Sequence, residues 1–306
     1  MNSIFFFWSD FESFVANEHN IDLSEVKLTS EKFNLKEALG FKNVSIFVDS
    51  RISEDDLVAL KTNGCECLLL RCAGFNMLNV EKAKEIGLKV FRVASYSPES
   101  IAEFVFALIL NLARKMNLQR RQHSTMQNGR SLDSMGFALK GRILGLHGYG
   151  KIGREVSNIA RNGFGMKVHF FDPFIDKSDN DTKVLDIYEL YKTSDIVSIH
   201  MPLNDETKHS VNFDLLSKAK DGIMIVNTAR GGLIESEAMI KYLDSGKVSY
   251  FGTDVWGDDD KFDERLYRDN TFQADHVAFF TDEAVYSILE QTMDSLSGRP
   301  LECNIL

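Results

Sequence analysis

Six residues near the middle of the chain, GYGKIG at 148–153, follow the pattern G-x-G-x-x-G. A strand-like apolar run, GRILGLHG, leads into them, and a helix-like segment follows them. The next strand-like run, MKVHFFD, ends at Asp172, nineteen residues after Gly153. A strand, this turn, a helix and an acid about 20 residues further on form the dinucleotide-binding fingerprint. The pattern therefore predicts a Rossmann-type parallel sheet that holds a dinucleotide.

Each residue of this fingerprint has its own task. Gly148 permits the tight turn, Gly150 lets the backbone approach the pyrophosphate, and Gly153 lets helix and strand pack closely. The pyrophosphate then lies on N–H groups at the positive end of the helix dipole. The Asp172 carboxylate is expected to accept hydrogen bonds from the adenosine ribose and to repel a 2′-phosphate, which favours NAD over NADP. The alternative is that Asp172 is only a turn residue before Pro173.

Strand-like runs alternate with helix-like segments along the chain, which indicates an α/β architecture with mostly parallel sheets. The predicted strands are SIFFFW, VSIFVD, CLLLRC, KVFRVA, GRILGLHG, MKVHFFD, DIVSIH, GIMIVNTA and YFGTDV. Ser53 is predicted to cap one helix. A long apolar helix is predicted over residues 97–117 and is expected to be buried between domains or subunits. With 306 residues the chain can form two domains.

Composition excludes several classes of partner. The formal net charge is −10 and there is no long basic run, so neither nucleic acid nor a membrane surface is expected to bind. The longest apolar stretch, FVFALILNLA, is too short to cross a bilayer. The first residues lack the features of a signal peptide, and we expect a cytoplasmic protein. Three of the four cysteines lie in CECLLLRC with no second cluster, so we expect reduced thiols and no metal.

An arginine and a histidine follow two of the later strands. Arg230 follows GIMIVNTA, at the end of a strand where ligands bind in open α/β sheets. Its planar guanidinium can bind a carboxylate through two parallel hydrogen bonds. His276 lies next to apolar residues in DHVAFF, and a histidine can donate a proton near neutral pH. Together with NAD, the two residues predict the reduction of a 2-oxo acid, whereas His147 is interpreted as a packing residue.

Motifs along nearly the whole chain carry a resemblance to a known family. They are RCAGFN at 71–76, YSPE at 96–99, GYGKIG at 148–153, HMPL at 200–203, NTARGG at 227–232, GTDVW at 252–256 and HVAFFT at 276–281. With these motifs the chain resembles the D-isomer-specific 2-hydroxyacid dehydrogenase family, and within it the D-lactate dehydrogenase branch. The resemblance implies two Rossmann-like, flavodoxin-like domains with parallel sheets. An NAD-binding domain of residues 96–280 would be inserted into a substrate domain of residues 1–95 and 281–306.

The resemblance also implies the roles of the site residues. Arg230 would bind the substrate carboxylate and keto oxygen, His276 would protonate the keto oxygen, and Asp259 would hold His276 protonated and oriented. Backbone N–H groups of Ala73 and Gly74 would bind the carboxylate, and Tyr96 would lie on the substrate. The implied cofactor-binding residues are Gly148, Tyr149, Gly150, Lys151, Ile152, Gly153, Asp172, His200, Pro202, Thr228, Ala229 and Asp254. Among these, Asp254 would contact the nicotinamide carboxamide.

Asp259 departs from the family pattern. The family acid is normally a glutamate five residues after the aspartate that is Asp254 in this chain. The aspartate side chain is shorter by about 1.5 Å, so either its loop lies closer to His276 or activity is reduced. Asp258 and Asp260 compete for the same role. The segment between Asp259 and His276 is also shorter than is typical, which alters the space around the substrate.

The predicted activity is the NADH-dependent reduction of a short 2-oxo acid, most simply pyruvate to D-lactate, by a homodimer. Two alternatives stay open. The substrate is a larger branched-chain, aromatic or dicarboxylic acid, or the protein is an NAD(H)-binding regulator without catalysis.

Overall fold

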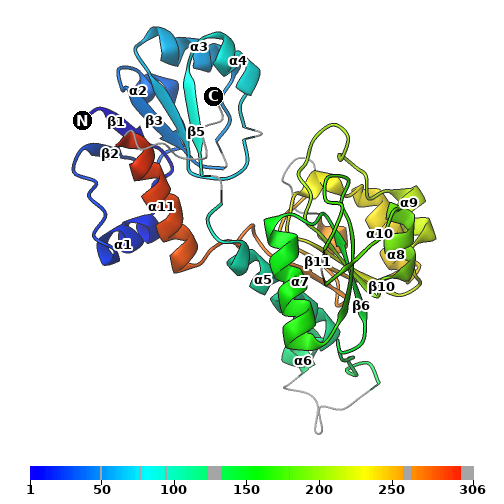
Figure 1. The fold of residues 1–306 in the computed structure, drawn as a ribbon. Helices are drawn as coiled ribbons and strands as arrows, with labels where there is room; N and C mark the ends of the chain where they lie inside the picture. The colour runs from blue at the N-terminus through cyan, green and yellow to red at the C-terminus, as the bar shows by residue number, and fades with distance from the viewer. Residues whose placement is uncertain are drawn as a thin grey trace. The chain divides into compact units, whose positions relative to one another are not determined.

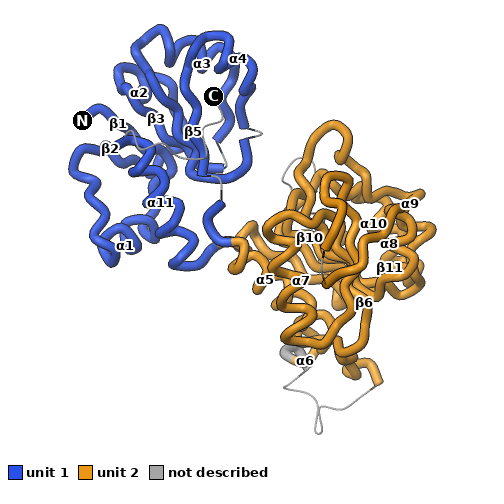
Figure 2. Tube along the Cα trace, viewed as in Figure 1, with its two compact units in different colours: residues 1–97, 280–306 blue, residues 98–279 orange. Residues whose placement is uncertain are grey.

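The computed structural model describes residues 1–48, 50–75, 77–93, 95–122, 132–178, 180–257 and 263–297 (Figure 1). The chain forms two compact units (Figure 2). Unit 1 comprises residues 1–97 and 280–306, and unit 2 comprises residues 98–279. The limits expected for the two domains lie within two residues of these, and the assignment of unit 1 to the substrate and of unit 2 to NAD stays a prediction. No helix among the described residues is long and apolar enough to span a membrane.

Unit 1 is built on a five-stranded parallel sheet with the order β2-β1-β3-β4-β5. Its strands are β1 (Ser3–Phe5), β2 (Val26–Leu28), β3 (Asn43–Ile46), β4 (Cys67–Leu70) and β5 (Lys89–Arg92). Its helices are α1 (Asp10–Glu18), α2 (Leu35–Ala38), α3 (Glu54–Thr62), α4 (Val80–Glu85) and α11 (Asp282–Leu296). Side chains alternate between the two faces of a strand. Phe5 and Leu69 therefore pack with α1 and α11, whereas Ile4 and Leu68 pack with α2, α3 and α4.

Unit 2 is built on a seven-stranded parallel sheet with the order β12-β11-β10-β9-β6-β7-β8. Its strands are β6 (Ile143–His147), β7 (Lys167–Phe171), β8 (Thr182–Lys183), β9 (Ile196–Ile199), β10 (Ile223–Asn227), β11 (Val248–Thr253) and β12 (Thr271–Gln273). Its α-helices are α5 (Pro98–Ala113), α6 (Met116–Gln122), α7 (Lys151–Phe164), α8 (Ile187–Thr193), α9 (Phe213–Lys218) and α10 (Ser236–Asp244). α5 and α7 cover one face of the sheet, and α8, α9 and α10 cover the other. Both sheets confirm the predicted α/β class.

The apolar helix predicted over residues 97–117 is two helices, α5 and α6. The first ends at Ala113, and Lys115 takes a left-handed conformation with φ of 51°. The buried face of α5 packs against α7 and the sheet inside unit 2. Its apolar sequence is thus explained within its own unit, and it gives no independent argument for a dimer.

The cysteines described, Cys65, Cys67 and Cys72, are buried free thiols. Burial raises the pKa of Cys65 to about 11 and that of Cys67 to about 12, so both stay protonated at neutral pH. Within the described ranges, no group of three or more histidine, cysteine or acidic side chains is arranged to hold a metal ion.

Candidate active site

The turn between β6 and α7 requires glycine for steric reasons. Gly148 has φ of +100°, and a Cβ there would lie 2.7 Å from the His200 carbonyl. A Cβ at Gly153 would lie 2.6 Å from the Gly148 carbonyl oxygen. At Gly150, which precedes α7 without a side-chain cap, a Cβ would meet nothing within 4 Å. The space beside Gly150 at the start of α7 is therefore open, as the close approach of a pyrophosphate to a helix start demands.

Tyr149 and Asp172 hold this turn against the end of β7. The Tyr149 N–H donates to Asp172 Oδ2 at 2.8 Å, and the Phe174 N–H donates to Asp172 Oδ1 at 2.8 Å. The Tyr149 ring points inward, where it stacks on Phe170 and its hydroxyl donates to Asp181. The Tyr149 side chain is therefore turned away from any cofactor at the glycine turn. Among the other predicted cofactor residues, Lys151 is exposed and Ile152 is half-buried in the first turn of α7.

His200 follows β9, which neighbours β6 in the sheet, and Thr228 follows β10, the next strand beyond β9. Burial lowers the pKa of His200 to about 3, so the ring is neutral. His200 Nε2 and Thr228 Oγ1 are buried and have no hydrogen-bond partner among the described residues. Buried polar atoms are normally paired. Unpaired polar atoms at the ends of β9 and β10, with the His200 backbone against the glycine turn, fit a bound dinucleotide. Pro202 and Ala229 follow the same strand ends.

Arg230 is held by a turn at the end of β10. The fully buried Asn227 accepts the Ala229 N–H with its side-chain oxygen at 3.0 Å. The side-chain NH₂ of Asn227 donates to the Arg230 carbonyl at 2.9 Å. Arg230 Nη1 donates to the Ala229 carbonyl at 2.6 Å, and the side chain is half-buried. The guanidinium therefore keeps further donors that no bond between described residues uses.

His276 follows β12 and has φ of 53°, a left-handed conformation that is uncommon outside glycine. Asp254, at the end of β11, holds this turn. Its carbonyl accepts the His276 N–H at 2.8 Å, and its carboxylate accepts the N–H groups of Val277 and Ala278, each at 2.8 Å. Asp254 is 0% exposed, and burial raises its pKa to about 6. In this structure the carboxylate binds the backbone of the His276 turn, and its expected contact with the nicotinamide carboxamide stays a prediction.

The turns of Arg230 and His276 are tied together. The Asn227 carbonyl accepts the Asp254 N–H at 3.0 Å and the Thr253 hydroxyl at 3.2 Å. A continuous set of hydrogen bonds thus runs from Asn227 through Asp254 to His276. Asn227 has no role among those predicted from the sequence. The sequence nevertheless indicates a turn here, since an asparagine side chain at a strand end often accepts a hydrogen bond from the N–H two residues later.

Asp259, Ala73, Gly74 and Tyr96 are the remaining predicted residues. Asp259 falls outside the described residues. Ala73 and Gly74 follow β4 in unit 1, where the Ala73 carbonyl accepts a hydrogen bond from Arg92 Nη1 at 2.6 Å. Tyr96 is half-buried and follows β5 in the same unit.

His147 lies in the core and leads to a prediction about acid stability. It is 7% exposed, its Nδ1 is 3.2 Å from the Tyr191 hydroxyl, and burial lowers its pKa to about 4. Between the unfolded pKa of about 6.5 and pH 4, only the unfolded chain protonates this ring, so stability falls as pH falls. Between pH 7.5 and pH 5 this protonation should lower the free energy of unfolding of the wild type by about 2 kcal/mol, and His147→Asn should not show this loss. Urea unfolding at pH 7.5 and pH 5 measures the free energy of unfolding of both proteins, with His209→Asn as the control. Equal losses in the wild type and in His147→Asn would contradict the prediction.

Comparisons with known proteins give matches over more than half of the chain. The family model of the D-isomer specific 2-hydroxyacid dehydrogenase, NAD binding domain, matches residues 106–278. The D-lactate dehydrogenase of Escherichia coli (strain K12) is 36% identical over 289 residues, which cover 89% of this chain and 87% of that protein.

Two solved structures are similar along almost the whole chain. The apo-structure of D-lactate dehydrogenase from Escherichia coli has a TM-score of 0.86 and 33% identity, and covers 100% of both chains. The D-lactate dehydrogenase from Aquifex aeolicus, complexed with NAD and lactic acid, has a TM-score of 0.86 and 27% identity, and covers 97% of this chain and 96% of that one. The predicted family and the NAD cofactor are confirmed. The chain belongs to the D-isomer-specific 2-hydroxyacid dehydrogenase family, in its D-lactate dehydrogenase-like branch, and is an NAD-dependent oxidoreductase.

Proposed function

We propose that the protein reduces a short 2-oxo acid, most simply pyruvate, to the D-2-hydroxy acid. NADH, when bound, supplies the hydride that adds to the substrate C2. A proton must then reach the keto oxygen, which becomes the hydroxyl. The observation that carries the proposal is the set of hydrogen bonds that fixes the turns of Arg230 and His276 at the ends of β10 and β12, the two strands on either side of β11.

The two residues divide the work. Arg230 binds the substrate carboxylate and stabilises the charge that develops on the keto oxygen. His276 donates the proton to that oxygen. Asp259, as the resemblance implies, holds His276 in its protonated form. Ala73 and Gly74 bind the carboxylate through N–H groups, and Tyr96 lies on the substrate.

A stereospecific assay over a panel of 2-oxo acids tests this proposal. NADH oxidation would be followed with pyruvate, a branched-chain, an aromatic and a dicarboxylic 2-oxo acid, and the product would be resolved by chiral chromatography. We expect the highest kcat/KM for pyruvate, with D-lactate as product. A higher kcat/KM for one of the other acids would identify that acid as the better substrate, and the reaction type would stay the same. NADH binding without turnover of any acid would favour the regulatory alternative.

Asp172 sets the expected cofactor preference. Its carboxylate is fixed by two backbone N–H groups at 2.8 Å, which leaves further lone pairs for the ribose hydroxyls. Asp172→Ala should weaken NADH binding by about 10-fold or more, the loss of a charge-assisted hydrogen bond, and should bring NADPH affinity closer to that for NADH. Fluorescence titration with each nucleotide measures both. Asp176→Ala removes an exposed acid of the same segment that pairs with Lys183, and is the control. An unchanged ratio of affinities in Asp172→Ala would refute the role.

We also propose that the protein is a homodimer, as the resemblance implies. Sedimentation at micromolar concentration tests it, and a monomer would contradict it. The cytoplasmic location stays a prediction from the sequence.

A further inference from the structure

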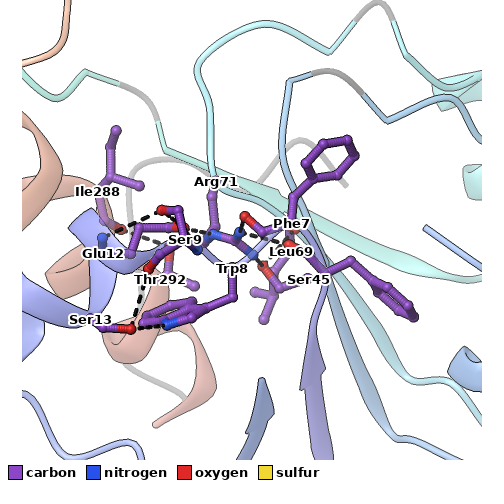
Figure 3. A network of polar contacts seen from close by, with 11 residues as sticks. Phe7, Trp8, Ser9, Glu12, Ser13, Ser45, Leu69, Arg71, Ile288 and Thr292 are labelled. Carbon is purple, nitrogen blue, oxygen red and sulfur yellow. Dashed lines mark hydrogen bonds and ion pairs between the residues drawn. The ribbon is translucent and has the colours of Figure 1, made fainter. Parts of the chain in front are cut away.

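Arg71 is the largest fully buried side chain of unit 1, at the carboxyl end of β4 (Figure 3). Its Nε donates to Glu12 Oε1 at 2.9 Å, its Nη1 to Ser45 Oγ at 3.0 Å, and its Nη2 to the Phe6 carbonyl at 2.7 Å. Burial lowers the pKa of this guanidinium, and the Glu12 carboxylate counteracts the effect. A buried ion pair is stable only when both partners are fully hydrogen-bonded.

Glu12 is satisfied on its other side as well. Its Oε2 accepts the Ser9 N–H at 3.0 Å and the Ser9 hydroxyl at 2.8 Å, which forms the capping box of α1. Ser45 Oγ donates onward to the Leu69 carbonyl at 3.2 Å. One guanidinium therefore joins the start of α1, the middle of β3 and the chain just after β1, as the dashed lines in Figure 3 show.

This position is not open to a ligand. In a sheet of the order 2-1-3-4-5, the crevice between β1 and β3 is where a ligand commonly binds. In unit 1 the Arg71 guanidinium fills it, between the rings of Phe5, Trp8 and Phe47 at 5.3, 5.7 and 5.7 Å. Because Arg71 is 0% exposed, it cannot contact the substrate itself.

What Arg71 can set is the path of the chain that follows it. The next residues are Cys72, Ala73 and Gly74, and the last two carry the N–H groups proposed to bind the carboxylate. The far side of this loop is held by Arg92, which donates to the Ala73 carbonyl at 2.6 Å and lies over the Phe75 ring at 5.1 Å. Both sides of the loop are thus attached to the sheet through arginine side chains.

We propose that the buried Arg71–Glu12 ion pair is a positioning device that sets the direction of the Ala73 and Gly74 N–H groups, and thereby the affinity for the substrate carboxylate. The inference rests on the proposed function, because it assigns those N–H groups to substrate binding. A loop that is anchored by three bonds at its base keeps its donors in one geometry before substrate arrives. Loss of one bond lets the loop take several geometries, and substrate binding must then select one.

Glu12→Gln is the principal test. The amide keeps the size of the side chain and can still accept from Arg71, but it loses the charge and one acceptor for Ser9. We expect KM for pyruvate to rise about tenfold, the equivalent of one misaligned carboxylate contact. kcat should change less than twofold, and NADH affinity should stay unchanged because the dinucleotide turn belongs to unit 2.

Asn43→Ala is the matched control. It removes a 3.1 Å hydrogen bond from Asn43 Nδ2 to Ser3 Oγ, which joins the amino ends of the same two strands, β1 and β3. It should lower the melting temperature without moving KM. If Glu12→Gln does not fold, Ser45→Ala takes its place, since it removes the acceptor of Arg71 Nη1 together with the hydrogen bond to the Leu69 carbonyl but leaves the ion pair intact. KM should then rise at least threefold.

The outcomes separate this inference from the proposed function. If the wild type reduces no 2-oxo acid, the proposed function fails first. If the wild type is active and the variant loses stability with an unchanged KM, as Asn43→Ala does, the ion pair is purely structural and the inference is overturned. A fall in kcat with an unchanged KM would overturn it too, because positioning of the carboxylate would not be the step affected.

Discussion

His276→Asn is expected to lower kcat about 10²- to 10⁴-fold, the usual contribution of a positioned proton donor. Asparagine is chosen because it tolerates the left-handed conformation better than other non-glycine residues, so the backbone at φ of 53° stays in place. The hydrogen bonds that Asp254 makes to this turn go to backbone N–H groups, and they survive the substitution. KM and NADH affinity should therefore change little.

Steady-state kinetics over pH 5–9 would measure this effect. His209→Asn is the matched control, because His209 has φ of 51° and is a histidine in the same backbone conformation. If His276→Asn kept more than a tenth of the wild-type kcat, another group would be the proton donor. An equal loss in both variants would point to the backbone instead of the imidazole.

Gly231→Ala should disrupt both activity and stability. A Cβ at Gly231 would lie 1.2 Å from the Trp256 carbonyl oxygen, far inside the 3.0 Å that real Cβ atoms keep. Either the turn of Arg230 or the segment after β11 must move, and Trp256 is fixed in turn by its indole N–H, which donates to the Ala274 carbonyl at 2.8 Å. A displacement of about 1 Å near reacting groups can cost about 100-fold in rate. Overpacking of this kind also destabilises by about 1–3 kcal/mol.

Gly257→Ala provides the control for this substitution. Its Cβ would lie 3.3 Å from the Ser236 hydroxyl, a side-chain atom that can rotate away. We expect kcat/KM within about threefold of the wild type for this variant, since exposed or adaptable sites change stability little. Urea unfolding and kcat/KM for pyruvate measure both variants. A Gly231→Ala enzyme with wild-type kcat/KM would show that Arg230 need not be placed by this contact.

Hydrophobic pattern predicted the elements that are long and apolar, and missed those that are short and polar. GIMIVNTA and MKVHFFD were predicted as strands because continuous apolar runs indicate buried parallel strands. The edge strands β2 (Val26–Leu28) and β8 (Thr182–Lys183) have too few apolar residues to give such a signal. The capping box of α1 was visible as Ser9 followed by Glu12 and was overlooked.

The site was predictable where it depended on strand ends, and not where it depended on distant contacts. Local motifs suffice to place Arg230 and the glycine turn, because each follows a strand of a parallel sheet. The inward direction of Tyr149 depends on Asp181, which is distant in sequence and joins it only through the fold. The same holds for Asp254, whose carboxylate binds a turn 23 residues away in the chain.

The bonds from Asn227 through Asp254 to His276 end mostly on main-chain atoms. Such bonds do not depend on the identity of the side chains that surround a substrate. A descendant of this protein can therefore exchange those side chains while Arg230 and His276 keep their places. Diversification of substrate within this fold then requires few compensating changes, provided that Asn227, Asp254 and Gly231 are retained.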